Sequence, residues 1–481
     1  MKPVQAALTS LSVRDRVTWF VHTVLVAVLI WNHEPWRDEL QAWSIAGASS
    51  TPLDIFTNTR LEGRPPGWQL LLWPFAQLTT SPRMMQFVAF VVGAVAVWWW
   101  LRIAALDWRL KAVVIFGFYF TGGYIVHARD YVLSFMVLMA AVAVYTRRGV
   151  GFHLACVLCV LAFANAFSLA MAAAFVAAAW LPELFGLLHS SARKRLMVVG
   201  SLAICVAWFA WAAYLTYPTA ENQFGVGRYK GFGRALTRSF IPLDYETAWF
   251  QRIDDFVAGG LLVAVLAFAW SRSRVAFIFV TLSMAMLLYN LTYGYGDYWW
   301  HFGNAAFVTF AAACFPASNR RQLPRSQIIA NFGMAGIVVI ALVNLTATRF
   351  GPGREVHSSR PYSLSLPAAQ QIRELCPDCT IIVDWDAVGA GISAQLGGKE
   401  LYYLNRGEFG TFAKFSNKNT VPTWEDGLAA LARFDRPLLI QTLFMAGPAP
   451  NDLELIGIHN EGIWDHNLIW QSSMKRIVPN D

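Results

Sequence analysis

Long apolar runs separated by short polar segments dominate residues 17–345 of this chain. The runs lie at residues 17–31, 84–101, 112–126, 131–146, 151–165, 168–188, 196–214, 256–270, 275–293, 301–317 and 327–345. A helix needs about 20 predominantly apolar residues to cross a bilayer, so the shorter runs must extend into their flanking aromatic residues. The pattern predicts a polytopic α-helical membrane protein with about eleven transmembrane helices.

Clustered basic residues then predict the orientation, because Lys and Arg are enriched in cytoplasmic loops. They fall in alternate loops: Arg14 and Arg16; Arg102, Arg109 and Lys111; Arg147 and Arg148; Arg193, Lys194 and Arg195; Arg272 and Arg274; Arg320, Arg321 and Arg325. This alternation holds only if the run at 68–78, which contains Pro74, does not cross. We therefore expect an interfacial helix at 68–78, a cytoplasmic N-terminus and an extracytoplasmic tail.

The tail differs from the rest of the chain in its sequence pattern, which consists of short strand-like and helix-like segments. "CTIIVDWDAVGAGISAQL" predicts a strand and a helix, "TWEDGLAALARF" a helix, and "PLLIQTLF", "LELIGI" and "NLIWQSS" strands. We expect a transmembrane module at residues 1–348 and a small C-terminal α/β extracytoplasmic domain at 349–481. Cys376 and Cys379 precede a strand rather than open a helix, so a local structural disulfide is favoured over a redox motif.

Composition agrees with a membrane protein and narrows its partners. The chain is 56% hydrophobic and 14% charged, whereas soluble domains carry about 25% charged residues. The net charge of +8 does not indicate nucleic-acid binding, because the clustered basic residues orient the spans. No small-residue cleavage site follows the first apolar run, which predicts an uncleaved signal anchor.

Ionisable and aromatic residues gather in the loops assigned to the outer face. These are "WRDELQAW" at 36–43, "EGRPPGW" at 62–68, "HARDY" at 127–131, the loop 215–255 and "YGDYWWH" at 295–301. Ionisable groups at membrane depth are costly and usually functional. Their gathering at one face suggests an extracytoplasmic active site.

These motifs carry a resemblance. Their order resembles that of the C-fold (GT-C) superfamily of membrane glycosyltransferases: "WRDELQAW", then "LEGRPPGWQLLLWP", then "HARDYVL", then "YWWHFGN". In the last motif of this chain, Trp300 stands where the superfamily would have arginine. Protein O-mannosyltransferases and the lipid A aminoarabinose transferase show a similar acidic pair and Pro-Pro motif. The resemblance implies a GT-C-like module of a bacterial branch, set in the inner (plasma) membrane. It also implies sugar transfer from a polyprenyl-phosphate donor to an extracytoplasmic glycan, lipid or protein acceptor.

The residues fit that chemistry without the resemblance. Glycosylation of a hydroxyl needs a carboxylate to take the acceptor proton, and Asp38 is the candidate base, the alternative being a pair with Arg37. Glu39 would orient Asp38 or pair with an arginine. Cations must meet the departing phosphate. The candidates for binding it are Arg64, Arg129 with Tyr131, His301, and Arg228, Lys230 and Arg234 in "GVGRYKGFGR".

No cofactor is required by these residues, and no metal-binding motif of spaced His or Cys appears. A divalent cation could still be held by carboxylates, for which the candidates are Asp38, Glu39, Glu62, Asp130 and Asp297. A transporter or flippase for a lipid-linked sugar is the alternative from another class, although the ionisable residues lie at one face rather than mid-membrane. An O-antigen ligase or polymerase and a non-catalytic scaffold are the remaining readings.

Overall fold

The computed structural model describes residues 11–217, 219–221, 232–241, 248–293, 299–316, 324–350, 363–442, 449–451, 453–459 and 467–472. The chain forms two compact units. The helical unit comprises Met1–Leu29, Ala89–Tyr217 and Val226–Arg354, and the mixed unit comprises Ile30–Val88, Pro218–Gly225 and Glu355–Asp481. Residues 30–88, which the sequence analysis placed in the transmembrane module, therefore share a unit with the tail.

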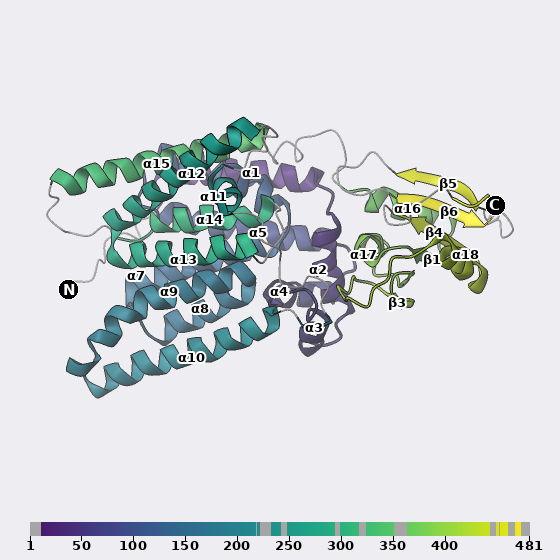
Figure 1. Ribbon diagram of the computed structural model, residues 1–481, viewed down its shortest axis with the longest axis horizontal. Helices are drawn as coiled ribbons and strands as arrows, with labels where there is room; N and C mark the ends of the chain where they lie inside the picture. The colour runs from purple at the N-terminus through teal and green to yellow at the C-terminus, as the bar shows by residue number, and fades with distance from the viewer. Residues whose placement is uncertain are drawn as a thin grey trace. The chain divides into compact units, whose positions relative to one another are not determined.

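Helices make up the helical unit, and two of them, α1 and α5, each continue at one end into the mixed unit (Figure 1). They are α1 (Val13–Asn32), α5 (Arg83–Ile103), α6 (Trp108–Ile115), α7 (Asp130–Arg148), α8 (Phe152–Ala164), α9 (Ala166–Phe185), α10 (Ala192–Thr216), α11 (Phe232–Phe240), α12 (Ala248–Arg272), α13 (Arg274–Tyr293), α14 (Trp299–Ala312) and α15 (Pro324–Phe350). A 3₁₀ turn, η1 (Phe118–Phe120), and a π turn, η2 (Gly122–Val126), follow α6.

Among the described residues, 7 helices are long and apolar enough to cross a membrane, or up to 8 if the bent pair formed by α6 and the turns after it is one span. The expected run at 112–126 is thus not a straight helix, since its two parts meet at 70°. The run at 151–165 forms α8, a helix of 13 residues. The eleven crossings stay a prediction.

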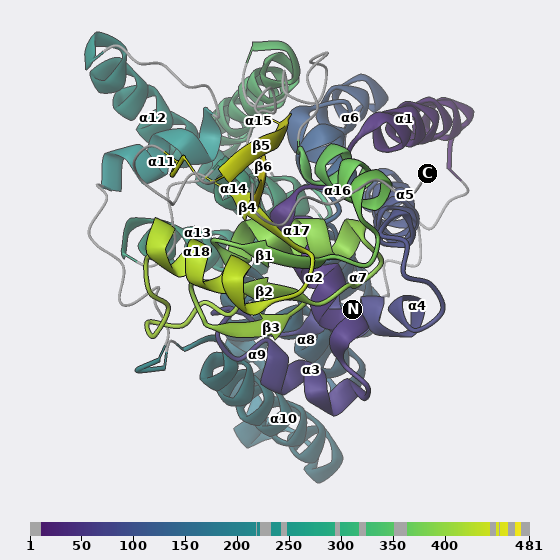
Figure 2. The same cartoon turned by 90° about the vertical axis from the view of Figure 1, so that its right-hand side faces the viewer.

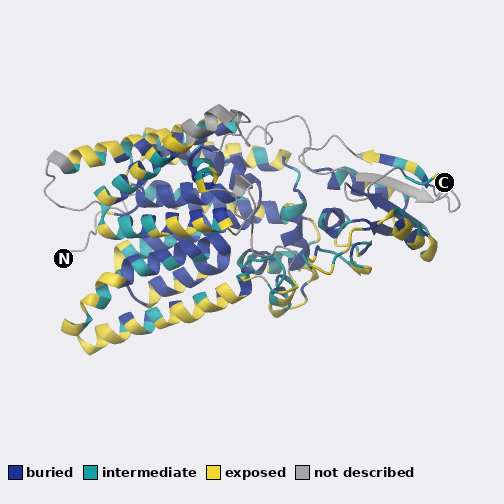
Figure 3. Ribbon diagram, in the orientation of Figure 1, coloured by how far each residue is buried: buried dark blue, intermediate teal, exposed yellow. Residues whose placement is uncertain are grey.

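Several of these helices expose apolar side chains, as a lipid-facing surface does. On α10, Leu196, Val199, Val206 and Trp211 are all exposed, and Figure 3 shows the exposed positions continuing along that helix. In water, apolar surface of this extent would favour aggregation or association. Together with the apolar helices, it identifies a membrane-embedded helical protein, as the sequence predicted.

Local polar residues and glycines determine where helices end and how closely they pack. Asn165 separates α8 from α9, because its Oδ1 accepts the backbone amide of Ser168 at 2.8 Å and its own backbone amide donates to Ser168 Oγ. On α15, Gly333 and Gly336 face α12, where an added Cβ would collide with the backbone of Phe268 and with Ala264. Small residues allow two membrane helices this approach.

The mixed unit combines short helices that follow α1 with an α/β layer from the tail. Its elements are α2 (Arg37–Ala48), α3 (Pro52–Asn58), α4 (Gly67–Ala76), α16 (Ser365–Leu375), β1 (Thr380–Val383), α17 (Asp386–Gln395), β2 (Leu401–Tyr403), β3 (Glu408–Gly410), α18 (Trp424–Arg433), β4 (Pro437–Gln441), β5 (Leu453–His459) and β6 (Asn467–Ser472). The tail elements predicted from the sequence are confirmed, whereas α16, β2 and β3 were not foreseen. The expected interfacial segment forms α4, whose 10 residues include Pro74.

A 6-stranded sheet forms the middle layer, in the order β3-β2-β1-β4-β6-β5. β1 pairs in parallel with β2 and β4, and the remaining pairs are antiparallel. Alternate residues of β1 enter two cores: Ile381 packs with Ile372 of α16, and Ile382 packs with Leu431 of α18. Helices therefore cover both faces of the sheet (Figure 2), which explains its continuous apolar strands.

We expect position 81, just before α5, to lie on the extracytoplasmic side. In a chain with the exposed Cys156 replaced by serine, Ser81→Cys should react with a membrane-impermeant maleimide in intact cells. The control is Ser191→Cys beside the basic residues 193–195, which should react only after permeabilisation. Labelling at 81 only from the cytoplasm would contradict the topology.

Candidate functional site

The start of α2 holds the acidic pair, and the structure gives its two members different roles. Glu39 is fully buried. Its Oε2 lies 2.9 Å from Nε2 of His33 and accepts the amide of Trp36, the residue before α2, at 3.1 Å. A carboxylate at this place satisfies a free backbone donor at the helix start and favours the helix dipole. Glu39 therefore fixes the helix start, and the partner that the sequence analysis expected to be an arginine is His33.

Asp38 precedes Glu39 on the same turn but points elsewhere. Its side chain is 31% exposed, and its Oδ1 lies 3.7 Å from Nε of Arg37. This contact is a loose ion pair at a partly exposed site, which contributes little to stability. The alternative role of Asp38, a pair with Arg37, is thus present in the structure, and it leaves a carboxylate accessible on a firmly anchored helix turn.

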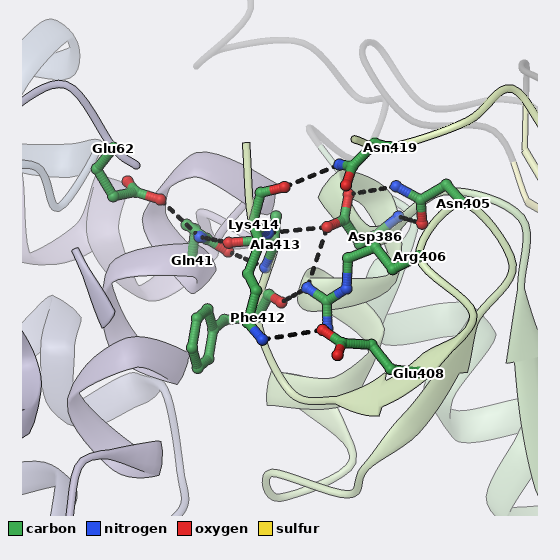
Figure 4. A network of polar contacts seen from close by, with 10 residues as sticks. All are labelled: Gln41, Glu62, Asp386, Asn405, Arg406, Glu408, Phe412, Ala413, Lys414 and Asn419. Carbon is green, nitrogen blue, oxygen red and sulfur yellow. Dashed lines mark hydrogen bonds and ion pairs between the residues drawn. The ribbon is translucent and has the colours of Figure 1, made fainter. Parts of the chain in front are cut away.

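Gln41, one turn further along α2, ties this helix to the loop that follows β3. Its Nε2 donates to the carbonyl of Ala413 and its Oε1 accepts the amide of Ala413, both at 2.8 Å. The same Nε2 donates to Glu62 Oε1 at 2.8 Å (Figure 4). Glu62 Oε2 in turn pairs with Arg64 at 2.8 Å. Arg64, predicted to bind substrate, thus balances the charge of a buried carboxylate.

A buried ion pair holds the far side of that loop (Figure 4). Asp386, at the start of α17, accepts Arg406 Nη1 at 3.1 Å, and the Lys414 amide at 2.8 Å. Asn405 donates to the second carboxylate oxygen at 3.0 Å. Burial raises the pKa of Asp386, against the opposing effects of Lys414, Arg406 and Asn405. The network fixes the loop that Gln41 contacts, and so supports the helix that carries Asp38.

We expect Arg406→Ala to lower the free energy of unfolding by about 3 kcal/mol, because it leaves the Asp386 carboxylate buried without its cation. The side chains of this pair are only 4% and 2% exposed. The control is Lys418→Ala, which removes the ion pair of Lys418 with Glu221. These side chains are 72% and 59% exposed, respectively, so their pair should contribute about 0–1 kcal/mol. Thermal unfolding of the purified chain in detergent compares the two, and equal shifts would contradict the assignment.

The second group of predicted residues lies in the helical unit, at the start of α7. Arg129 is the residue before that helix, is buried, and places its guanidinium 5.4 Å from the ring centre of Tyr131. Tyr131 stacks on Tyr124 at 4.6 Å. His127 Nδ1 lies 2.6 Å from the carbonyl of Gly122, which closes the preceding turn. The structure thus brings Arg129 and Tyr131 together, with the guanidinium held against an aromatic face.

His301 and Arg234 are placed differently from each other. His301 is buried on α14 with its ring 5.3 Å from Phe167. Two residues later, a Cβ on Gly303 would collide with Tyr119 and Tyr124, which explains the glycine in "HFGN" by close packing. Arg234 is exposed on α11. Arg228 and Lys230, the other members of that glycine-rich motif, lie outside the described residues.

Within the described ranges, no group of three or more His, Cys, Asp or Glu side chains is placed to hold a metal ion. Asp297, one of the carboxylates considered from the sequence, is not among the described residues. In the tail, Cys376 and Cys379 form a disulfide. This settles the pairing that the sequence analysis favoured.

Comparison with known proteins finds no matching protein family, no curated relative and no similar solved structure.

Sequence reasoning missed the residues that anchor the site. His33 stands six positions before its partner Glu39, in a polar stretch where nothing marks a pair. Gln41 and Ala413 are 372 positions apart, and one partner contributes only its backbone. Asp386 follows the predicted strand β1, but Arg406 follows β2, which was not foreseen, so the sequence did not mark their pairing.

Proposed function

We propose that this chain is an inverting glycosyltransferase that moves a sugar from a polyprenyl-phosphate carrier to a glycan, lipid or protein acceptor outside the cytoplasmic membrane. The observation that carries the proposal is the arrangement of the acidic pair. Glu39 fixes the start of α2 through His33 and Trp36, while the side chain of Asp38 beside it is 31% exposed and lies 3.7 Å from Arg37. A positioned, accessible carboxylate suits a general base.

In the proposed reaction, Asp38 takes the proton of the acceptor hydroxyl as its oxygen attacks the anomeric carbon of the sugar. The bond from that carbon to the phosphate oxygen breaks, and polyprenyl phosphate leaves with the bonding electrons. Attack opposite the leaving group inverts the anomeric configuration. Arg129 is proposed to bind the carrier phosphate, where a guanidinium offers two parallel donors to phosphate oxygens.

Two observations support the proposed location. The order of the motifs "WRDELQAW", "LEGRPPGW", "HARDYVL" and "YWWHFGN" resembles the GT-C superfamily. The Cys376–Cys379 disulfide is typical of an oxidising compartment, so it favours an extracytoplasmic C-terminal domain. On this proposal the protein belongs to a bacterial plasma membrane, with about eleven crossings and a cytoplasmic N-terminus.

The test is a comparison of envelope glycans and carrier lipids in cells that lack the protein. Wild-type chain, but not Asp38→Asn, should restore one missing glycan, and the deletion strain should accumulate a polyprenyl-phosphate sugar. If the protein were a flippase, the deletion strain would instead retain that sugar lipid in the inner leaflet, and the Asp38→Asn chain would restore the glycan. No change in any glycan or carrier lipid on deletion would contradict the proposal.

A further inference from the structure

A cavity of about 300 Å³ lies wholly within the mixed unit, between the start of α5 and the helices α16 and α17. Thr80, Ser81 and Arg83 line it on the α5 side, and Arg373 and Gly397 line it on the other. Gly397 has a φ of +79° and faces Thr80, so the two walls approach each other at this point. The proposed transfer reaction uses none of these residues.

Arg83 and Arg373 each bind backbone carbonyls at the end of a helix. Arg83 Nη1 donates to His33 O at 3.0 Å, just beyond α1, and to Gln86 Oε1 at 2.9 Å. Arg373 Nη2 donates to the carbonyl of Gln395, the last residue of α17. A cation is favourable at a helix C-terminus. These contacts hold both guanidinium groups in place, and they use only part of each.

The rest of each guanidinium is available to a ligand. A guanidinium has five N–H donors, and within the described part of the chain the bonds of Arg83 involve Nη1 alone and those of Arg373 involve Nη2 alone. Arg83 thereby keeps the edge formed by Nε and Nη2, which can bind two oxygens of one anion. Neither arginine forms an ion pair with a described carboxylate.

Charge and donor number together indicate the class of ligand. Two arginines line this cavity, and the lining residue Leu366 donates its amide to Glu34 Oε1 at 2.9 Å. The hydroxyls of Thr80 and Ser81 add further donors on the lining. A phosphate carries up to two negative charges and three strong acceptor oxygens, so it matches this set better than a carboxylate does.

We propose that this cavity is a phosphate-binding site, for the phosphate of either a lipid headgroup or a soluble phosphorylated compound. Its volume of about 300 Å³ leaves room for a substituent beyond the phosphate itself. Arg83 and Arg373 bind the phosphate from opposite walls, and Ser81, two residues before Arg83, lines the same cavity. The proposal stands independently of the transfer reaction.

The experiment measures two probes on the purified full-length chain. Inorganic phosphate is titrated with detection by ³¹P NMR line broadening, and phosphatidic acid binding is measured in nanodiscs against phosphatidylcholine alone. Arg373→Gln should weaken binding at least about tenfold, as expected for loss of a charge-assisted contact. Ser81→Trp, which fills the cavity and leaves both arginines in place, should do the same.

The control is Arg433→Gln, which removes an equal charge from the exposed face of α18 in the same unit. It should leave both affinities unchanged. A response to inorganic phosphate would assign a soluble ligand, and a response to phosphatidic acid alone would assign a lipid headgroup. The proposal is overturned if neither probe binds the wild-type chain, or if Arg373→Gln and Arg433→Gln bind both probes equally.

Discussion

Replacement of Asp38 by asparagine should lower the rate of sugar transfer by at least about 100-fold while the protein stays folded. The substitution keeps the shape of the side chain and removes the proton acceptor, and general-base catalysis contributes about 10²–10⁴-fold. The Asp38 side chain is 31% exposed, and a partly exposed ion pair such as the one with Arg37 contributes little, so stability should hardly change. The measurement is the initial rate of transfer by purified wild-type and Asp38→Asn protein, with thermal unfolding recorded for both.

Two variants show whether the effect belongs to this carboxylate. Asp435→Asn removes an exposed aspartate of the same unit and should leave the rate unchanged. Glu39→Gln should instead destabilise the fold by about 3 kcal/mol, because it leaves the amide of Trp36 and the ring of His33 without a buried charged partner. Normal turnover by Asp38→Asn would remove Asp38 from the role of base.

Arg129→Ala should weaken binding of a polyprenyl-phosphate analogue by one to two decades and leave acceptor binding nearly unchanged. A charge-assisted hydrogen bond in a partly dry site contributes about 1.5–3 kcal/mol. Arg129→Lys should recover only part of the affinity, since lysine keeps the charge and loses the planar fork. Equilibrium binding of the analogue to the three proteins is the measurement.

A control for this prediction lies on the same helix. Arg148 is exposed at the other end of α7, and Arg148→Ala should bind the analogue as the wild type does. Equal affinities for wild type, Arg129→Ala and Arg129→Lys would make Arg129 a structural residue that packs on Tyr131. Arg228, Lys230 and Arg234 would then become the residues to test for phosphate binding.

Structural features that depend on residues close together in the sequence were predictable from it. The apolar runs predicted membrane helices, and Asn165 separates two of them where the pattern had a gap. The strand and helix after Cys379 appear as β1 and α17. The bend within the run at 112–126 was not predictable, because hydropathy describes the apolar character of a segment and not the path of its backbone. Gly117, at the bend, packs against the backbone and side chain of Asn344, far along the chain.

The candidate site was predictable in its residue types and less so in its partners. The acidic pair at the start of α2 was identified, yet the sequence alone could not tell which carboxylate is buried. That depends on His33, which turns back onto Glu39, and on the contact of Gln41 with Ala413. The sequence makes Arg64 a candidate phosphate ligand, whereas the structure pairs it with Glu62, because a buried carboxylate needs a nearby cation.

Transfer of a labelled sugar by the purified chain tests the proposed function most directly. The chain is placed in proteoliposomes with polyprenyl phosphates that carry a labelled hexose or pentose, together with envelope membranes from cells that lack the protein as the source of acceptor. We predict that wild-type protein moves label from at least one donor to an acceptor, with inverted anomeric configuration and an equal amount of polyprenyl phosphate released, and that Asp38→Asn does not. The account would be contradicted if the sugar–phosphate bond of every donor stayed intact, or if the donors only moved from one leaflet to the other.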